Sequence, residues 1–247
     1  NRNHKSFQTT MKQIINHFTD DDLYKLSMCC SVIDNYPRAQ VKYQFVDRNN
    51  TVYPTGFADE LRRQIEALEG VIITDDEIDF MKRRCSYMPH WFFTYLRGYR
   101  FSREWVNVSQ DIDGHLHVEF EGSWSDTILL EVKVLAMISE LFYIMTGQIA
   151  RLDYVQLYNK TCQKAERLLA AGCVFSDFGT RRRASFEAED TVVRALKDTY
   201  QSRDWKGRLV GTSNVYIAMT HDLQPVGTMA HEFARLAACL DRKWPIT

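Results

Sequence analysis

The chain has 247 residues, of which 45% are hydrophobic, so it holds enough apolar material for one large domain or two modest ones. Its 31 lysines and arginines nearly balance 32 aspartates and glutamates, which argues against binding to nucleic acid or to a charged membrane surface through overall charge. Residues 1–15 lack the apolar core of a signal peptide, and no run approaches the roughly 18 apolar residues of a membrane span, so we expect a cytoplasmic protein.

The first half of the chain mixes helical and strand patterns. Residues 20–30 carry three aspartates ahead of LYKLSMCC, which is typical of a helix whose first turn places acids at the positive end of its dipole. Residues 41–48 alternate apolar and polar side chains, which predicts a strand with one buried face. Residues 59–70 place apolar side chains on one helical stripe and end at a glycine, a preferred residue just past a helix end.

Three further patterns complete this half. Thr74 and Glu77 have the spacing of a capping box, which predicts that a helix begins there. Residues 115–122 alternate again and predict a second strand. Residues 122–145 form a long, largely apolar stretch suited to a buried helix, and its four charged residues argue against a membrane span. We therefore expect an α+β domain over residues 1–150.

Residues 151–247 repeat the order strand, loop, helix. The expected strands and loops are 173–180, 208–214 and 224–228. The expected helices that follow them are 185–200, 214–221 and 229–238. Such alternation argues for parallel strands joined by crossover helices, in a doubly wound sheet or a barrel.

Each of these strands ends in a Gly-Thr pair. The pairs are Gly179 and Thr180, Gly211 and Thr212, and Gly227 and Thr228. Loops that follow parallel strands gather at the face where ligands bind, so we expect the three pairs to be neighbours. Glycine lets the backbone approach a ligand, and threonine adds a hydroxyl beside helix N-terminal amides that favour anions. The pattern predicts an anion site, with chance recurrence as the alternative because glycine is common in loops.

Three consecutive arginines follow the first pair. Guanidinium groups match carboxylates and phosphates bidentately, and cations at a helix N-terminus oppose its dipole. A merely solvated helix start is therefore disfavoured. We expect at least one of Arg181, Arg182 and Arg183 to bind an anion, and the others to pair with Glu187 or Glu189.

His231 follows the third pair, at the start of a helix. On spacing alone three roles stay open: a capping residue of the turn, a general base, or a nucleophile toward phosphorus. A zinc site is disfavoured because the sequence HEFAR lacks the second histidine of the HExxH motif.

Five segments together resemble the nicotinate phosphoribosyltransferase family, in order and over nearly all of the chain. They are DDDLYKLSM (20–28), GSWSDTILLEVKVLAMISEL (122–141), FSDFGTRRR (175–183), LVGTSNV (209–215) and PVGTMAHEF (225–233). FGTRRR, GTSN and GTMAHE are highly specific in combination. The resemblance implies formation of nicotinate mononucleotide and pyrophosphate from nicotinate and phosphoribosyl pyrophosphate, coupled to ATP hydrolysis, as the first step of NAD salvage.

The resemblance also implies a fold class and partners. The fold is α/β: an irregular α/β barrel joined to an N-terminal α+β sandwich, in a homodimer with shared active sites. ATP and Mg²⁺ are the implied cofactors, no residue of this chain is assigned to a metal, and neither nucleic acid nor a membrane is a partner. Residues 151–247 would form the first part of the barrel, because the family's later acidic phosphoribose and magnesium motif is absent.

Two explanations for the absent motif stay open. Either the chain is a fragment or a cleaved product of a complete enzyme, or a separate polypeptide supplies the missing half. We expect that 247 residues do not close a barrel, which would leave apolar strand edges exposed. The activity of the isolated chain is open for the same reason.

The resemblance assigns roles to individual residues. His231 matches the family's transiently phosphorylated histidine, and with Arg181 it forms the catalytic set. Tyr24 would stack on the pyridine ring from the neighbouring subunit, with Phe178 on the other face. Arg181 would hold the nicotinate carboxylate or a substrate phosphate. The other implied substrate-binding residues are Gly179, Thr180, Arg182, Gly211, Thr212, Ser213, Gly227 and Thr228.

Ser213 bears on substrate choice. Related nicotinamide enzymes carry an aspartate at this place, which accepts from the amide, whereas a serine spares a substrate carboxylate the repulsion. We therefore expect preference for nicotinate over nicotinamide. The alternatives are a nicotinamide or quinolinate phosphoribosyltransferase, which Ser213 and the HEF sequence disfavour, and a truncated, noncatalytic binding or oligomerisation partner that keeps the anion-binding loops.

Overall fold

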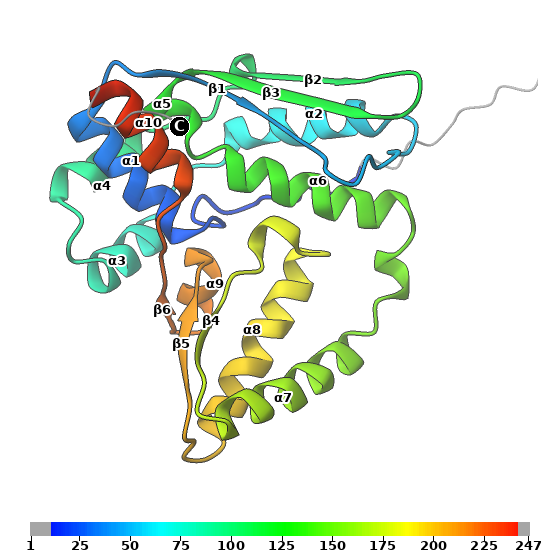
Figure 1. Ribbon diagram of the computed structural model, residues 1–247, viewed down its shortest axis with the longest axis vertical. Helices are drawn as coiled ribbons and strands as arrows, with labels where there is room; N and C mark the ends of the chain where they lie inside the picture. Colours follow the sequence, from blue (N-terminus) through cyan, green and yellow to red (C-terminus); the bar gives the residue numbers. More distant parts are fainter. Residues whose placement is uncertain (1–10, 242–247) are drawn as a thin grey trace, which may run out of the picture.

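The structure, a computed structural model, describes residues 11–241 as a mixed α/β fold with two small sheets (Figure 1). The upper part in Figure 1 contains an antiparallel sheet with helices beneath it. Its helices are α1 (Leu23–Asn35), α2 (Phe57–Ala67), α3 (Asp75–Arg84), α4 (His90–Gly98), α5 (Trp124–Thr127) and α6 (Glu131–Met145). Its strands are β1 (Gln40–Gln44), β2 (Val106–Gln110) and β3 (Leu116–Ser123), in the order β1-β3-β2.

The lower part contains a parallel sheet in the order β4-β5-β6, with α7 and α8 packed against each other beside it (Figure 1). Its elements are α7 (Tyr154–Ala170), β4 (Val174–Asp177), α8 (Phe186–Gln201), β5 (Arg208–Thr212), α9 (Val215–Thr220) and β6 (Gln224–Pro225), and the chain then continues into α10 (His231–Asp241). Short 3-10 helices are η1 (Leu68–Gly70), η2 (Arg103–Trp105), η3 (Ile149–Arg151) and η4 (Thr180–Arg182).

Several predicted elements are confirmed. The helix expected at residues 59–70 appears as α2 followed by η1. The capping box is present, since the Thr74 side chain accepts from the Glu77 amide and the Glu77 carboxylate accepts from the Thr74 amide. The strand pattern at 115–122 is β3, and the three strands expected after residue 170 are parallel neighbours, as predicted.

Other expectations were wrong or incomplete. Residues 122–145 do not form one helix, because Ser123 ends β3 and caps the short helix α5, and α6 begins only at Glu131. Helix α4 and strand β2 were missed, because their aromatic and polar residues follow neither pattern clearly.

The acids before α1 are the clearest error of local interpretation. The helix begins at Leu23, its first turn contains no acidic residue, and the Asp22 side chain makes no capping hydrogen bond. The aspartates at positions 20 to 22 lie before the helix and are buried. They therefore serve tertiary contacts rather than the helix dipole.

One large hydrophobic core fills the upper part and extends to Val215 and Ala218 of α9. A second, smaller cluster lies between α7, α8 and β5 and consists of Ala165, Leu169, Leu196 and Leu209. Helix α10 returns to the upper part, where Phe233 contacts the Trp124 ring at 5.7 Å between centroids (Figure 1). Contacts therefore cross the boundary expected near residue 150, and that domain boundary stays a prediction.

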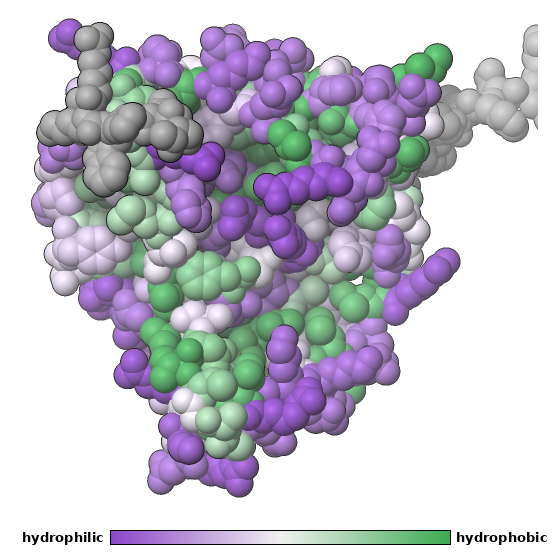
Figure 2. All heavy atoms as spheres, viewed as in Figure 1, coloured by the Kyte–Doolittle hydropathy of each residue, from purple (hydrophilic) through white to green (hydrophobic). Residues whose placement is uncertain are grey.

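The parallel sheet is open within residues 11–241, and that it forms the first part of an irregular α/β barrel stays a prediction. Figure 2 shows apolar side chains gathered over the lower part of the molecule, around this sheet. Val174 on the outer strand β4 is 64% exposed, which agrees with the expectation of exposed apolar residues at a strand edge. No helix between residues 11 and 241 is long and apolar enough to cross a membrane.

Candidate functional site

The parallel sheet brings the three Gly-Thr loops to one edge. Asp177 at the end of β4 pairs with Thr212 at the end of β5, and Thr212 pairs with Pro225 at the end of β6. Beyond the strands, the Ser213 amide donates to the Asp177 carbonyl at 2.9 Å, and the Val226 amide donates to the Thr212 carbonyl at 2.9 Å. The chain therefore leaves all three strands at the same place, as the repeated pattern predicted.

The glycines of these loops have different neighbours. A Cβ on Gly211 would lie 1.9 Å from the Gln224 carbonyl oxygen, so this glycine permits the close approach of β5 and β6. A Cβ on Gly227 would lie 3.7 Å from the Leu23 side chain, so the third loop reaches the start of α1. At Gly211 the requirement comes from strand packing and does not depend on a ligand.

Two of the threonine hydroxyls are used within the loops. Thr180 donates to Glu189 at 2.7 Å and accepts from the Asn214 amide group at 3.3 Å. Thr212 donates to the Asp177 carboxylate at 2.9 Å. Both threonines are fully buried, whereas Thr228 in the third loop is exposed. Thr180 and Thr212 therefore hold the loops in place.

The three aspartates before α1 each bind a different part of the chain. Asp20 accepts two hydrogen bonds from Arg183, at 2.6 and 2.8 Å. Asp21 accepts from Lys133 of α6 at 2.5 Å, and Asp22 accepts from the Ser213 hydroxyl at 2.6 Å. All three aspartates are buried. Through these contacts the segment connects α6 with the loops that follow β4 and β5.

Arg183 is buried in a group of three carboxylates. Besides Asp20, it pairs with Glu189 at 3.2 Å and approaches Glu140 at 3.4 Å. The predicted pairing of one arginine of the triplet with Glu189 is confirmed. Its guanidinium faces protein carboxylates, so Arg183 is not the arginine that is open to a ligand.

The carboxylates around Arg183 predict a pH-dependent stability. Burial raises the pKa of Glu189 to about 8 and that of Glu140 to about 7, although Arg183 partly offsets both shifts. The folded state then binds more protons than the unfolded state between about pH 4.5 and 8, so the free energy of unfolding falls as pH rises through this window. Carboxyls with a lowered pKa, such as Asp20, change the free energy of unfolding only at lower pH.

Urea unfolding at pH 5, 6, 7 and 8 measures this slope. The Glu189→Gln variant is expected to flatten it, because the titrating group is removed. An equal slope in the variant and the parent chain would show that Glu189 does not carry the effect.

Arg181 is the arginine that faces a cleft. Its side chain is 46% exposed, its guanidinium lies 6.0 Å from the centre of the Tyr24 ring, and it stands between Asp22 at 3.9 Å and Glu131 at 3.7 Å. It lines a cleft of about 850 Å³ together with Arg182, Glu131 and residues that follow β1. Both carboxylates are beyond hydrogen-bond distance, so the guanidinium N–H groups remain available to an anion.

Lys25 is buried, and the sequence alone left its role open between a supporting contact of the site and a helix cap. Its ammonium group has no exposed surface and donates to Glu131 of α6 and to Glu232 of α10, the latter at 2.7 Å. Glu232 also accepts from the Tyr43 hydroxyl at 3.0 Å. The only sequence signal was a lysine inside an otherwise apolar helical stretch, which does not reveal two partners more than 100 residues away.

These contacts connect the predicted site residues. Ser213 donates to Asp22, which lies beside Arg181, and Arg181 lies beside Glu131. Lys25 continues the series from Glu131 to Glu232, the neighbour of His231 in the sequence. The loops after β4 and β5 and the start of α10 are thus linked through α1 and α6.

The other predicted site residues differ in how far they are exposed. His231 lies at the first position of α10 and is exposed, and its ring nitrogens have no hydrogen-bond partner within residues 11–241. Ser213 is fully buried. Tyr24 is only 2% exposed, and burial raises its pKa above the usual range. Phe178 is 47% exposed and lines a second pocket of about 350 Å³. Stacking of the pyridine ring between Phe178 and a Tyr24 from the neighbouring subunit stays a prediction.

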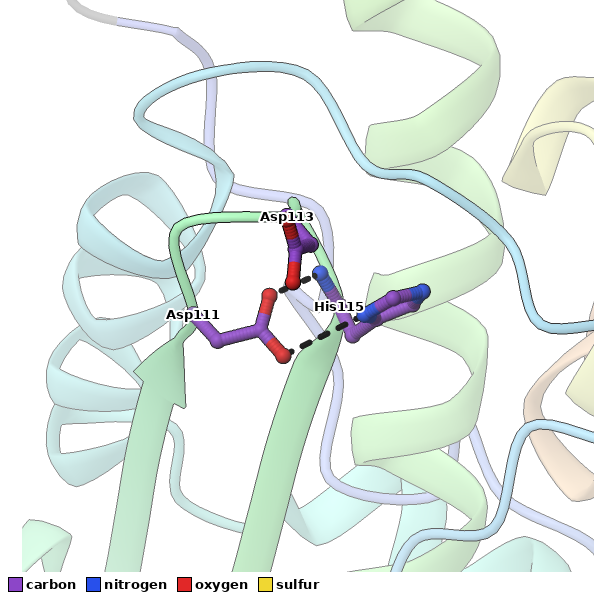
Figure 3. Close-up of side chains that lie close together, drawn as sticks. All are labelled: Asp111, Asp113 and His115. Carbon is purple, nitrogen blue, oxygen red and sulfur yellow. Dashed lines mark hydrogen bonds and ion pairs between the residues drawn. The ribbon is translucent and has the colours of Figure 1, made fainter.

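A group of possible metal ligands lies away from this site, at the turn between β2 and β3 (Figure 3). Asp111, Asp113 and His115 place their ligand atoms within 4.8 Å of one another. Asp111 accepts from the His115 amide at 2.8 Å and lies 3.2 Å from its ring nitrogen Nδ1. These hydrogen bonds account for the turn geometry without an ion.

Comparison with known proteins matches both halves of the chain to the same family. Residues 19–139 match the family model of the nicotinate phosphoribosyltransferase (NAPRTase) N-terminal domain, and residues 173–243 match that of the nicotinate phosphoribosyltransferase (NAPRTase) family. A nicotinate phosphoribosyltransferase of Desulforapulum autotrophicum is 35% identical over 89% of the chain and 55% of its own length. Nicotinate phosphoribosyltransferase 1 of Pseudomonas aeruginosa is 39% identical over 90% of the chain and 55% of its own length.

Solved structures agree. The crystal structure of nicotinate phosphoribosyltransferase from Porphyromonas gingivalis has a TM-score of 0.86 and 36% identity, over 92% of this chain and 57% of that one. A putative nicotinate phosphoribosyltransferase from Saccharomyces cerevisiae has a TM-score of 0.88 and 29% identity, over 95% and 59%. The chain thus spans a little more than half the length of the relatives it matches.

Proposed function

The chain belongs to the nicotinate phosphoribosyltransferase family, and from this membership we propose that it forms nicotinate mononucleotide and pyrophosphate from nicotinate and phosphoribosyl pyrophosphate, coupled to ATP hydrolysis. This reaction would be the first step of NAD salvage. The observation that supports the proposal best is Arg181, half exposed at a cleft, with carboxylates on both sides that leave its N–H groups free.

The chemistry of the reaction fits such a residue. Displacement at the anomeric carbon passes through a cationic sugar while pyrophosphate leaves, so the protein must position anions and needs no covalent nucleophile for the sugar. Arg181 would hold the nicotinate carboxylate or a substrate phosphate. Arg182, which is exposed and lines the same cleft, would add positive charge nearby.

Ser213 would act on specificity through Asp22. Its hydroxyl donates to Asp22 inside the protein, which helps to satisfy a carboxylate that lies beside Arg181. An aspartate at position 213 would place a second carboxylate against Asp22. We propose that the absence of this second negative charge favours nicotinate, which carries a carboxylate, over nicotinamide. In the Ser213→Asp variant the ratio of pyrophosphate release with nicotinate to that with nicotinamide is expected to fall, and this ratio does not depend on the folded fraction of a variant with like charges at a buried position.

Mg²⁺ does not fit the three aspartates before α1. Asp20 and Asp21 are bound to Arg183 and Lys133, and Asp22 to Ser213. A divalent cation prefers several oxygen ligands that are free to coordinate it. Ligands for Mg²⁺ in the proposed reaction would therefore lie outside this group of residues, and we assign it no role here.

His231 is our candidate for phosphorylation by ATP. An exposed imidazole at the start of α10 that has no hydrogen-bond partner among residues 11–241 is accessible to a phosphate donor. We further propose a cytoplasmic homodimer with shared active sites, in which Tyr24 and Phe178 enclose the pyridine ring.

The His231→Ala variant tests this assignment. We expect it to lose ATP consumption coupled to nicotinate turnover and to show weaker apparent affinity for phosphoribosyl pyrophosphate. Pyrophosphate release with nicotinate, with and without ATP, measures both effects. His90→Ala is the matched control, since that histidine lies on α4, apart from the predicted site residues. Unchanged coupling in His231→Ala would refute the role of this histidine.

The proposed activity itself has a direct test. Pyrophosphate release from the chain with nicotinate and phosphoribosyl pyrophosphate, accompanied by an intact-mass measurement, supports the enzyme. Binding of nicotinate without release at the same mass contradicts an independent activity and supports a noncatalytic partner.

A further inference from the structure

Five charged side chains of alternating sign form a continuous series beside the cleft. In order they are Asp22, Arg181, Glu131, Lys25 and Glu232. They come from the start of α1, the loop after β4, α6, α1 again and α10. Among these five, only Arg181 is more than a quarter exposed.

Glu131 is shared between the two cations of this series. Its oxygen Oε2 accepts a hydrogen bond from the Lys25 ammonium, whereas its other oxygen, Oε1, lies 3.7 Å from Nη1 of Arg181. The contact with Lys25 is a hydrogen bond and the contact with Arg181 is not. Lys25 therefore holds this carboxylate, and Arg181 keeps its donors.

Lys25 itself is firmly placed. Its ammonium lies 5.6 Å from the centre of the Tyr24 ring and 5.7 Å from that of Tyr43, within the range of cation–π attraction. The Tyr43 hydroxyl donates to Glu232 and accepts from the Trp124 indole at 3.2 Å. A group with no exposed surface and contacts on several sides has little freedom to leave Glu131.

We propose that Lys25 is a positioning residue that keeps Arg181 available to an anionic substrate by holding Glu131 away from it. The inference rests on the proposed function, in which Arg181 binds an anion. A carboxylate and a guanidinium pair bidentately when nothing prevents it, and such a pair would compete with the substrate for the same N–H groups.

The first test is the affinity for nicotinate and, separately, for phosphoribosyl pyrophosphate, each measured by calorimetry on the full chain; the anion that Arg181 holds is the one whose affinity falls in Arg181→Met. Lys25→Met is expected to weaken binding about tenfold, because the released Glu131 closes on Arg181. The double variant Lys25→Met/Glu131→Gln is expected to recover affinity to within about threefold of the parent chain. Neutralising Glu131 also relieves its repulsion with Glu232, so urea unfolding of each variant accompanies the calorimetry and affinities are compared only among variants that are fully folded at the temperature of the measurement. Lys42→Met, which removes an exposed lysine paired with Glu119, is the control for charge alone.

The single variant Glu131→Gln keeps the inference testable if Lys25→Met does not fold. Binding of nicotinate is expected to be equal or tighter, since a competing carboxylate has been removed. Weaker binding in Glu131→Gln, or no recovery in the double variant, would overturn the role of Lys25.

Arg181→Met separates this inference from the function on which it rests. If Arg181→Met leaves the affinities for both nicotinate and phosphoribosyl pyrophosphate unchanged, the proposed anion site is wrong. If Arg181→Met abolishes binding while Lys25→Met leaves it unchanged, the anion site stands and the role of Lys25 is wrong.

Discussion

Replacement of Arg183 by methionine is expected to lower the free energy of unfolding by about 3–5 kcal/mol. The arginine is buried among Asp20, Glu189 and Glu140, and it makes a two-point contact with the first of them. Without the guanidinium, these carboxylates remain together in a place from which water is excluded. Equilibrium unfolding in urea at pH 7 measures the loss.

Arg97→Ala is the matched control for this variant. It removes an arginine that pairs with Asp75 on the surface, where both side chains are largely exposed. Pairs of that kind contribute about 0–1 kcal/mol. If Arg183→Met lost no more stability than Arg97→Ala, the buried group of charges would not be essential to the fold.

The second large effect is expected from Gly211→Ala. The added methyl would lie 1.9 Å from the Gln224 carbonyl oxygen, and a backbone atom cannot rotate away as a side chain can. We expect a loss of upwards of about 3 kcal/mol and the separation of β6 from β5. Because β6 leads to Gly227 and α10, binding of nicotinate should fall as well.

Gly70→Ala provides the comparison, since a methyl there would meet nothing within 4 Å. Unfolding measurements on the two variants should differ clearly. Similar stabilities would mean that the chain can separate β5 and β6 slightly at little cost.

Local patterns in the sequence predicted the elements that depend on local physics. Alternating apolar residues marked β3, and the spacing of Thr74 and Glu77 marked the start of α3. The order of strand and helix after residue 170 indicated three parallel strands, and hence loops that meet at one edge. Each of these follows from spacing over a few residues, or from a rule about how parallel strands connect.

The partners of charged residues were not predictable in this way. Three aspartates before a helix resemble a favourable interaction with its dipole, yet Asp20, Asp21 and Asp22 bind partners more than 100 positions away. The arginine triplet likewise divides into the buried Arg183 and the exposed Arg181. The sequence shows where the charged residues lie along the chain. The packing of distant segments decides which of them is neutralised by a protein partner and which stays accessible to a ligand.

The segment of three aspartates also bears on the order of events during folding. Its side-chain partners lie 163, 112 and 191 positions further along the chain. Closing such long loops costs entropy before any contact is gained. On a ribosome, Asp22 cannot find its hydroxyl partner until residue 213 has emerged, so this contact forms after those among residues 23–150 have become possible. We expect its amide protons to become protected from exchange late, after those of the helix pair α7 and α8.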